Sequence, residues 1–248
     1  MTGEEALALL QTTARAVRNA LRGIDDWGPA GTRPGQYRSD LAADAAALAV
    51  LDRAGVGVLS EESGLRPGGQ GVTVVVDPVD GSTNAARGIP WYATSLCAVD
   101  GAGPLAAVVV NLASGVAFEA VRGGGAWCGG HPVRPSGCTR LRSAVLGLSG
   151  YPPRYLGWKQ FRALGAAALD LCAVASGVLD GYLDCSADAH GAWDYLGGML
   201  VCQEAGAHVV DAQGRELVAL EHGARRTPVA AATAELLDQL VSARHSFA

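Results

Sequence analysis

Residues 72–84 read VTVVVDPVDGSTN and join an apolar run to a pair of acidic side chains. The first five residues are all β-branched, which is typical of a short buried strand. Asp77 follows the run, and Pro78 is expected to stop further sheet pairing because proline has no backbone N–H to donate. Asp80 comes three residues after Asp77. The next four residues, Gly81 to Asn84, predict a tight turn with hydroxyl groups that cap a helix.

The two carboxylates at the end of this strand predict chemistry as well as structure. Carboxylates are hard oxygen ligands that suit Mg²⁺, and the N–H groups at a helix start suit phosphate. By itself, however, the stretch favours a plainer interpretation, a strand followed by an Asp-Pro turn and an Asp-Gly turn. Two further acidic segments change the balance, SEESG at residues 60–64 and AWD at residues 192–194. Together the three segments favour a metal-assisted phosphoryl site.

With these segments in this order, the sequence resembles the inositol monophosphatase family of Mg²⁺-dependent, Li⁺-sensitive sugar phosphatases, from about Asp44 to about Gly214. The resemblance implies a layered α/β (α+β) sandwich of the αβαβα type, like inositol monophosphatase and fructose-1,6-bisphosphatase. Residues 1–138 would form an N-terminal lobe with an antiparallel sheet and most metal ligands. Residues 139–248 would form a mixed C-terminal lobe on the substrate side of one catalytic domain. A homodimer is an expectation from the family alone.

The composition excludes several other classes of protein. Apolar residues make up 49% and charged residues 17% of the 248-residue chain, as in a folded globular protein. A formal charge of −5 argues against a nucleic-acid-binding or anionic-membrane surface. No apolar run reaches the length of a membrane span, and no signal-peptide pattern opens the chain. The six cysteines show no zinc spacing, so we expect a cytoplasmic protein.

Apolar spacing and turn signals predict further helices and strands along the chain. Helices are predicted over residues 2–22, 194–205 and 235–242. Another is predicted to begin at Ser39 or Asp40 as its cap and to run through residue 53. An Ala-rich helix, into which residues 162–168 lead, is predicted to run through residue 175. Strands are predicted at residues 94–99, 105–111, 116–121, 145–148 and 207–210. Thr2 with Glu5 predicts a capping box for the first helix. The run GGGAW at residues 123–127 does not match a dinucleotide-binding pattern and predicts a hairpin.

The resemblance also implies two or three Mg²⁺ ions and assigns ligands to two of them. The first ion would take Glu61, Asp77 and the Val79 carbonyl. The second ion would take Asp77, Asp80 and Asp194. Hydrolysis of a phosphate monoester has a very high uncatalysed barrier, and such ions offset the charge of the phosphate and activate water. Asp77, at the end of the strand, is the expected bridge between them.

Glu61, Ser82 and Asp80 are the catalytic residues that the resemblance implies. Ser82 stands where the family usually has Thr, and its hydroxyl is expected to pair with Glu61 to orient and deprotonate water. The backbone N–H groups of Gly81 and Ser82 would hold the phosphate, a role compatible with helix capping. Asp44 is expected to close a lid loop over the metals. The predicted mechanism is in-line attack by water without a covalent enzyme intermediate.

The family's alcohol-binding positions fall on residues from several segments of this chain. They are Asp80, Arg162, Gly165, Ala166, Ala167, Asp184 and Asp194. Ala166 replaces a hydroxyl-bearing residue of the family pattern, and Asp184 replaces the usual Glu. The loop at residues 185–192 is longer than in typical members. Its His190 is expected to be an exposed loop residue, because neutral imidazole is a poorer Mg²⁺ ligand than oxygen.

These features predict a Mg²⁺-dependent phosphomonoesterase acting on inositol monophosphate or a similar small polyol or sugar monophosphate. Thr83 favours this branch, because relatives acting on histidinol phosphate or 3′-phosphoadenosine 5′-phosphate tend to carry Lys or Arg there. Fructose 1,6-bisphosphate would need a further basic pocket, and the sequence shows no clear basic cluster. A non-catalytic binding protein that retains the fold, or a structural Ca²⁺ site, are the alternatives from other classes. The presence of all four carboxylates argues against the first, since like charges are costly to keep together.

Overall fold

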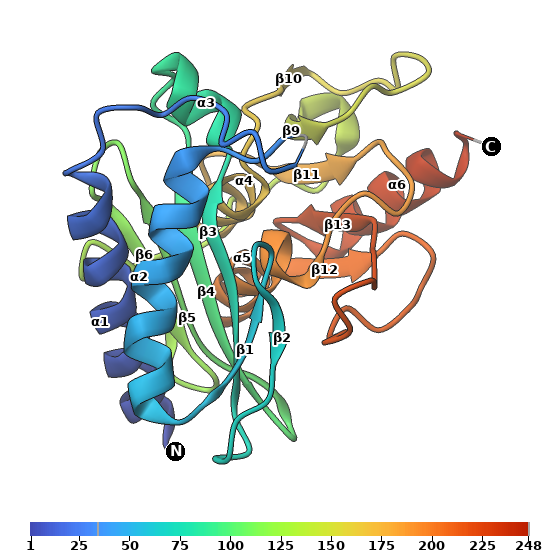
Figure 1. The fold of residues 1–248 in the computed structure, drawn as a ribbon. Coiled ribbons are helices and arrows are strands. Elements are labelled where there is room, and N and C mark those ends of the chain that lie inside the picture. Colours follow the sequence, from blue (N-terminus) through green and yellow to red (C-terminus); the bar gives the residue numbers. More distant parts are fainter. Residues whose placement is uncertain (34, 248) are drawn as a thin grey trace.

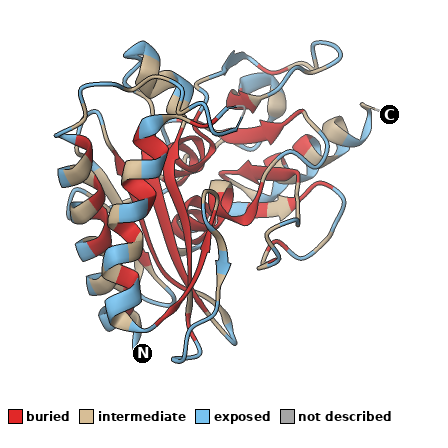
Figure 2. Cartoon of the chain, viewed as in Figure 1, coloured by how far each residue is buried: buried red, intermediate tan, exposed pale blue. Residues whose placement is uncertain are grey.

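The computed structural model describes residues 1–33 and 35–247, which form two sheets with helices between and outside them (Figure 1). The layers follow the order helices, sheet, helices, sheet, helix, so the expected αβαβα sandwich is confirmed. The buried residues are concentrated in the strands and in the two helices between the sheets (Figure 2). A chain of this size can therefore bury a large shared core.

The first sheet has eight strands in the order β2-β1-β3-β4-β5-β6-β7-β8. Their bounds are β1 Gly57–Ser60, β2 Gly64–Arg66, β3 Thr73–Asp80, β4 Ala93–Asp100, β5 Gly103–Asn111, β6 Ala117–Val121, β7 Gly125–Cys128 and β8 His131–Pro132. The predicted strands in this region, and the hairpin at the glycine run, are all present. β3 lies inside the sheet, parallel to β1 and antiparallel to β4. Its position explains why its residues are almost continuously apolar.

Pro78 interrupts the pairing of β3 but does not end it, so that part of the prediction is wrong. Asp77 pairs with Ser95, the register then shifts, and Asp80 pairs with Ala93. The missing N–H of proline is accommodated by this irregularity, and the ladder resumes two residues later. The local twist of such a bulge places both carboxylates at the same end of the sheet.

Helices α1, Gly3–Leu21, and α2, Arg38–Ala54, cover the outer face of the first sheet (Figure 1). The capping box of α1 is confirmed, because the Thr2 hydroxyl accepts the Glu5 N–H at 3.2 Å and Glu5 accepts the Thr2 N–H at 2.8 Å. The cap of α2 is Tyr37 and not Ser39 or Asp40. The Asp40 carboxylate instead reaches back from the first turn and accepts the Tyr37 N–H at 2.9 Å.

Helices α4, Ala167–Ala175, and α5, Ala192–Ala205, fill the layer between the sheets. They pack closely against each other and against the first sheet because α5 has glycines at the contacts. A Cβ on Gly197 would lie 2.7 Å from the Ser95 hydroxyl, and one on Gly198 would lie 2.6 Å from the Leu171 Cβ. The close approach brings the start of α5 next to the end of β3.

The second sheet has the order β10-β9-β11-β13-β12 and mixes parallel with antiparallel pairs. Its bounds are β9 Val145–Ser149, β10 Gln160–Arg162, β11 Gly181–Asp184, β12 His208–Asp211 and β13 Pro228–Ala231. Helix α6, Ala234–His245, covers its outer face, and the short helices α3, Ser82–Arg87, and η1, Leu141–Ser143, complete the fold. The sequence patterns did not predict β10, β11 or β13, which are only three or four residues long.

Candidate functional site

The end of β3 and the first turn of α5 meet in a cluster of carboxylates. One oxygen from each of Asp77, Asp80 and Asp194 lies within 4.8 Å of the others. Asp77 is 1% exposed and Asp80 is 7% exposed. The structure therefore brings Asp194 to the pair Asp77 and Asp80, from which it is separated by more than a hundred positions in sequence. Glu61, just after β1, lies close enough for its charge to act on Asp77 and for Asp194 to act on it.

Burial and mutual repulsion make these carboxyl groups hard to ionise when no cation is present. Burial, followed by the charges of Asp194 and Glu62, raises the pKa of Glu61 to about 8. Burial and neighbouring carboxylates also raise the pKa of Asp77 and of Asp80 well above the usual range. Such strong shifts at a convergent group are typical of functional sites.

The hydrogen bonds of the cluster leave one buried oxygen without a partner. Asp80 accepts the Ala168 N–H at 2.7 Å, and Asp194 accepts the Gly191 N–H at 2.7 Å. Asp77 Oδ1 is buried and has no hydrogen-bond partner among the described residues. A buried, unpaired carboxylate oxygen beside two further carboxylates fits a hard divalent cation, which takes oxygen ligands and offsets their repulsion. The residues present therefore fit the expected Mg²⁺.

The turn after β3 positions the groups that were expected to hold phosphate. Gly81 has the left-handed backbone at φ 85°, and a Cβ there would lie 3.0 Å from the Gly165 carbonyl oxygen, so this position requires glycine. The Ser82 hydroxyl donates to the Val79 carbonyl at 2.8 Å. This carbonyl is the one expected to ligate the first metal. No hydrogen bond joins Ser82 to Glu61 among the described residues.

Two aspartates of α2 lie in different surroundings, and only one of them faces the cluster. The Asp44 carboxylate accepts the hydroxyls of Ser60 at 2.5 Å and Ser63 at 3.4 Å. Asp40 is 3% exposed, and burial raises its pKa to about 6, although the Tyr37 N–H and the nearby Ser82 hydroxyl oppose the shift. Asp40, and not the Asp44 named from sequence, therefore reaches the turn after β3. The sequence carries no signal that separates the two aspartates, because both lie near the start of α2.

The segment at residues 164–168 borders the cluster, but Arg162 does not extend into it. Asn84 donates to the carbonyls of Trp91 and Leu164, each at 2.7 Å, and so ties this segment to α3. Ala166 and Ala167 are buried beside it. Arg162 is exposed on β10, and its guanidinium donates to Phe161 O and to the Gln160 side chain. Arg162 is one of the expected alcohol-binding residues, but its guanidinium bonds to its own strand.

Asp184 and His190 differ most from their expected positions. Asp184 ends β11 and is 0% exposed, with its Oδ2 lacking a hydrogen-bond partner among the described residues. His190 is not an exposed loop residue, because its side chain is only 13% exposed and lies between Asp184 and Asp194. Burial by itself would lower the pKa of His190, but the carboxylates of Asp194 and Asp184 raise it to about 9. The loop between β11 and α5 therefore places the imidazole between two acids.

A cavity of about 290 Å³ opens beside Glu61 and contains a basic group that the sequence did not reveal. Arg33 pairs with Glu62 at 2.6 Å, and the Arg225 guanidinium lies 5.0 Å from the centre of the Trp193 ring. The residues lining the cavity are Arg33, Gly35, Gln36, Glu61, Glu62, Trp193, His222 and Arg225. They come from four distant segments, so no local run of basic residues indicates this cavity in the sequence.

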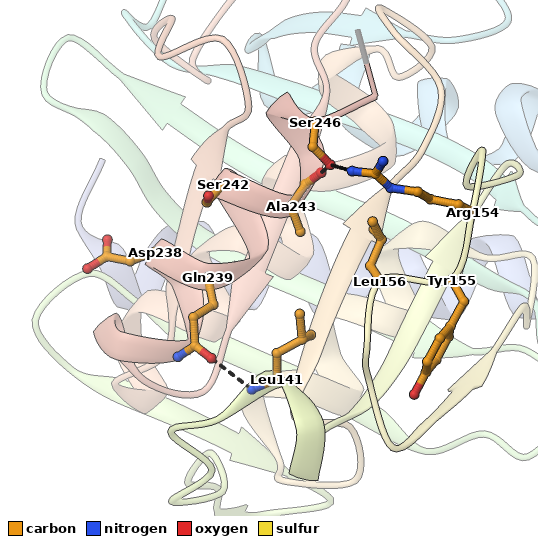
Figure 3. Close-up of a pocket in the computed structure, with 9 residues that line it drawn as sticks. All are labelled: Leu141, Arg154, Tyr155, Leu156, Asp238, Gln239, Ser242, Ala243 and Ser246. Atoms are coloured by element: carbon orange, nitrogen blue, oxygen red, sulfur yellow. Dashed lines mark hydrogen bonds between the residues drawn. The ribbon is translucent and has the colours of Figure 1, made fainter.

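A larger cavity, of about 610 Å³, lies on α6 and the loop before β10 (Figure 3). It is lined by Leu141, Arg154, Tyr155, Leu156, Asp238, Gln239, Ser242, Ala243 and Ser246. None of the carboxylates of the cluster borders it. In Figure 3 the polar groups bond to one another, as Arg154 does to Ser246 at 3.0 Å and Gln239 to Leu141 at 3.0 Å. The carboxylate cluster, and not the larger cavity, is therefore the candidate functional site.

The protein has an α/β fold of two sheets separated by a helical layer. Its candidate site is a carboxylate cluster where β3 meets α5. Comparison with known proteins specifies the family. The model of the inositol monophosphatase family matches residues 38–247, and the chain belongs to that family of phosphatases.

Two characterised relatives and one solved structure show how similar the chain is to members of this family. It is 37% identical to a fructose-1,6-bisphosphatase/inositol-1-monophosphatase of Thermococcus kodakarensis over 76% of this chain and 75% of that protein. It is 35% identical to the inositol-1-monophosphatase SuhB of Mycobacterium tuberculosis over 71% of this chain and 63% of that protein. A crystal structure of extragenic suppressor protein SuhB from Bartonella henselae superposes with a TM-score of 0.82 at 27% identity. That match covers 97% of this chain and 98% of that one.

The length matched among relatives varies. The match to the Nus factor SuhB of Xylella fastidiosa, at 33% identity, spans 64% of this chain and 62% of that protein.

Among the described residues, no helix combines the length and apolar character needed to cross a bilayer.

Proposed function

We propose that this protein is a Mg²⁺-dependent phosphomonoesterase that hydrolyses small polyol or sugar monophosphates, inositol monophosphate among them. The observation that carries the proposal is the convergence of Asp77, Asp80 and Asp194, with one buried Asp77 oxygen unpaired. Burial and repulsion both oppose the ionisation of such a cluster, and a bound cation would offset that cost. Membership in a family of phosphatases supports the same conclusion.

The residues that would hold Mg²⁺ are Glu61, Asp77, Asp80 and Asp194, with the Val79 carbonyl. Bound Mg²⁺ supplies positive charge that offsets the phosphate dianion and lowers the pKa of water. The protein supplies the placement of these oxygens. β3 is held inside a sheet, and the Ala168 N–H fixes the Asp80 carboxylate. A rigid support of this kind favours a reaction that depends on alignment.

Asp40 and Ser82 are the residues we assign to water activation, in place of the pairing of Ser82 with Glu61 expected from sequence. The Ser82 hydroxyl lies between Asp40 and the Val79 carbonyl. A carboxylate with a pKa of about 6 accepts a proton effectively near neutral pH. In this arrangement Ser82 orients the water and Asp40 takes its proton. The backbone N–H groups of Gly81 and Ser82 remain the proposed phosphate contacts.

Release of inorganic phosphate tests this proposal directly. The purified protein is expected to release phosphate from inositol 1-phosphate when Mg²⁺ is added and to stop when EDTA removes it. A protein that retained the fold only for binding would release none. A structural Ca²⁺ site would instead give thermal stabilisation by Ca²⁺ with no hydrolysis in Mg²⁺.

Fructose 1,6-bisphosphate is a second candidate substrate because of the basic cavity beside Glu61. Arg33, His222 and Arg225 line that cavity, and Arg225 has no carboxylate within 4.0 Å among the described residues. Several relatives carry both fructose-1,6-bisphosphatase and inositol-1-monophosphatase in their names. If this cavity holds a second phosphate, Arg225→Ala will raise KM for the bisphosphate and leave KM for inositol 1-phosphate unchanged.

Family membership further supports inhibition by Li⁺ and a homodimeric state. Both are simple to measure, the first as loss of phosphate release with added LiCl. The second is measured as the mass of the protein in sedimentation equilibrium.

A further inference from the structure

The loop between β11 and α5 holds His190 in a fixed position on the side of the cluster next to Asp184. The His190 N–H donates to the Arg226 carbonyl at 3.2 Å, and the Arg226 N–H donates to the His190 carbonyl at 2.8 Å. These two bonds form an isolated antiparallel bridge between distant segments. The backbone of His190 is therefore anchored to the chain just before β13, and its ring lies beside Asp194 of the cluster.

Both ring nitrogens of His190 face groups of the protein. Its Nε2 lies 3.6 Å from Asp184 Oδ2 and 3.1 Å from the Tyr182 hydroxyl, and its Nδ1 lies 3.6 Å from Asp194 Oδ2. What the imidazole has left to offer a ligand is its faces and its C–H edge. Such a surface offers no hydrogen-bond acceptor, unlike a carboxylate, which accepts several hydrogen bonds.

Asp184 has no surface through which a substrate could reach it. It is 0% exposed, and its Oδ1 accepts the Ser186 N–H at 2.9 Å. The other oxygen, Oδ2, faces the His190 ring and makes no hydrogen bond among the described residues. His190 retains 13% exposure of its side chain. Between these two residues, only His190 can touch a molecule bound at the cluster.

We propose that His190, and not Asp184, is the residue that meets the alcohol of the substrate and determines which phosphate esters this protein prefers. This inference rests on the proposed phosphatase function. Because the imidazole covers the carboxylate, hydroxyls of a polyol ring find no acceptor on this side. Ala166 carries no hydroxyl, so its side chain offers a polyol no hydrogen-bond partner either. Within the proposed function, the protein therefore gains little from the additional hydroxyls of a polyol or sugar ring and also accepts phosphate monoesters of alcohols that carry few hydroxyls.

The experiment compares two esters, inositol 1-phosphate and p-nitrophenyl phosphate, in saturating Mg²⁺. The measured quantity is the ratio of their kcat/KM values, since p-nitrophenol carries no further hydroxyl. His190→Ala uncovers the Asp184 carboxylate and is expected to raise this ratio roughly tenfold, mainly by lowering KM for the inositol ester. Asp184→Asn by itself is expected to change the ratio less than about twofold. Asp184→Asn added to His190→Ala is expected to reverse the gain.

Two further variants keep the result interpretable. His190→Gln preserves polar contacts with less loss of volume and is expected to give a smaller rise. His208→Ala, at an exposed position of β12, is the matched control. Circular dichroism and thermal melting establish that each variant is folded. The inference is overturned if Asp184→Asn by itself shifts the ratio about tenfold, or if His190→Ala and His190→Gln both leave it unchanged. If the unaltered protein hydrolyses neither ester, the proposed function fails and the inference with it, a result seen before any variant is made.

Discussion

Asp77 and Asp211 are both buried carboxylates on strands, yet their surroundings are opposite. Asp211 is 3% exposed and accepts hydrogen bonds from Thr227 N–H at 2.8 Å and from the Arg215 guanidinium at 2.8 Å and 3.0 Å. Asp77 is 1% exposed and has one oxygen without any partner among the described residues. No arginine or lysine is paired with Asp77 among those residues.

The pKa values follow from these surroundings. Burial by itself would raise the pKa of Asp211, but hydrogen bonds from Arg215 and from backbone N–H groups hold it below its usual range. Burial and the charges of Glu61 and Asp80 raise the pKa of Asp77 far above it. The comparison teaches that a buried carboxylate supplied with donors supports the fold, whereas one surrounded by other carboxylates is prepared for a cation.

Asparagine substitutions should give the largest difference between the carboxylate cluster around Asp77 and the surroundings of Asp211. Asp80→Asn is expected to reduce kcat for phosphate release on the order of 10³-fold, because it removes a charge that the reaction requires. The same variant should melt at a higher temperature than the unaltered protein in EDTA, since one repelling carboxylate is gone. Retained turnover would contradict the assignment of the cluster as the catalytic site.

Asp211→Asn is the matched variant of the second region. It is expected to lose on the order of 2–4 kcal/mol of unfolding free energy, because the Arg215 guanidinium loses its charged partner. The folded fraction should keep its kcat. Urea denaturation measures the first quantity, and initial rates corrected for folded protein measure the second. A stable Asp211→Asn protein would show that donors around this carboxylate matter less than we argue.

The two aspartates of α2 extend the comparison to smaller effects. Asp40→Asn is expected to lower kcat about 10²-fold, the usual scale for removing a general base. Asp44→Asn removes only its hydrogen bonds with Ser60 and Ser63 and should cost about 1 kcal/mol of stability with kcat unchanged. The reverse result, with Asp44 controlling the rate, would restore the residue predicted from sequence.

Stability against pH, with and without Mg²⁺, tests the sign of the pKa shifts. Glu61 has a folded-state pKa of about 8 against an ordinary value of 4.5, so it stabilises the fold below pH 4.5 and that contribution is lost as the pH rises through 8. Asp211, with a lowered pKa, behaves oppositely and loses its contribution as the pH falls below 3.8. In EDTA the melting temperature should therefore fall from about pH 5 to about pH 8.

Added Mg²⁺ should remove most of this fall and stabilise the protein by about 2.7 kcal/mol at a concentration near 100 times its Kd. The Asp80→Asn variant is the control, because Mg²⁺ should raise its melting temperature less. Its loss of stability at acidic pH, where Asp211 becomes protonated, should be unchanged. Differential scanning calorimetry gives both measurements. A pH profile that is identical with and without Mg²⁺ would show that the cation does not bind at the carboxylates.

Ser82→Thr should have the smallest effect. Threonine keeps the hydroxyl that bonds the Val79 carbonyl and adds one methyl group, so kcat is expected to change less than about threefold. Ser82→Ala removes the hydroxyl and is the informative control, with an expected fall near that of Asp40→Asn. Equal rates for the serine and alanine proteins would exclude Ser82 from water activation.

Patterns among near neighbours in the chain were enough to predict much of the architecture. The β-branched run before Asp77 predicted a buried strand, and Thr2 with Glu5 predicted the start of α1, because these features depend on residues a few positions apart. The order of the acidic segments was enough to indicate the family, which the comparison of residues 38–247 confirms. The short strands β11 and β13 were missed, since four residues carry too little periodicity.

What only the tertiary structure decided is which side chains face one another across long separations. Asp40 and Asp44 both lie near the start of α2 and look equivalent in sequence, but the packing of α2 on β3 directs only Asp40 toward Ser82. His190 looked like an exposed loop residue until the second sheet anchored its backbone and two carboxylates enclosed its ring. Local propensity acts over a few residues, whereas burial and charge act through space, so the contents of the site depended on the completed fold.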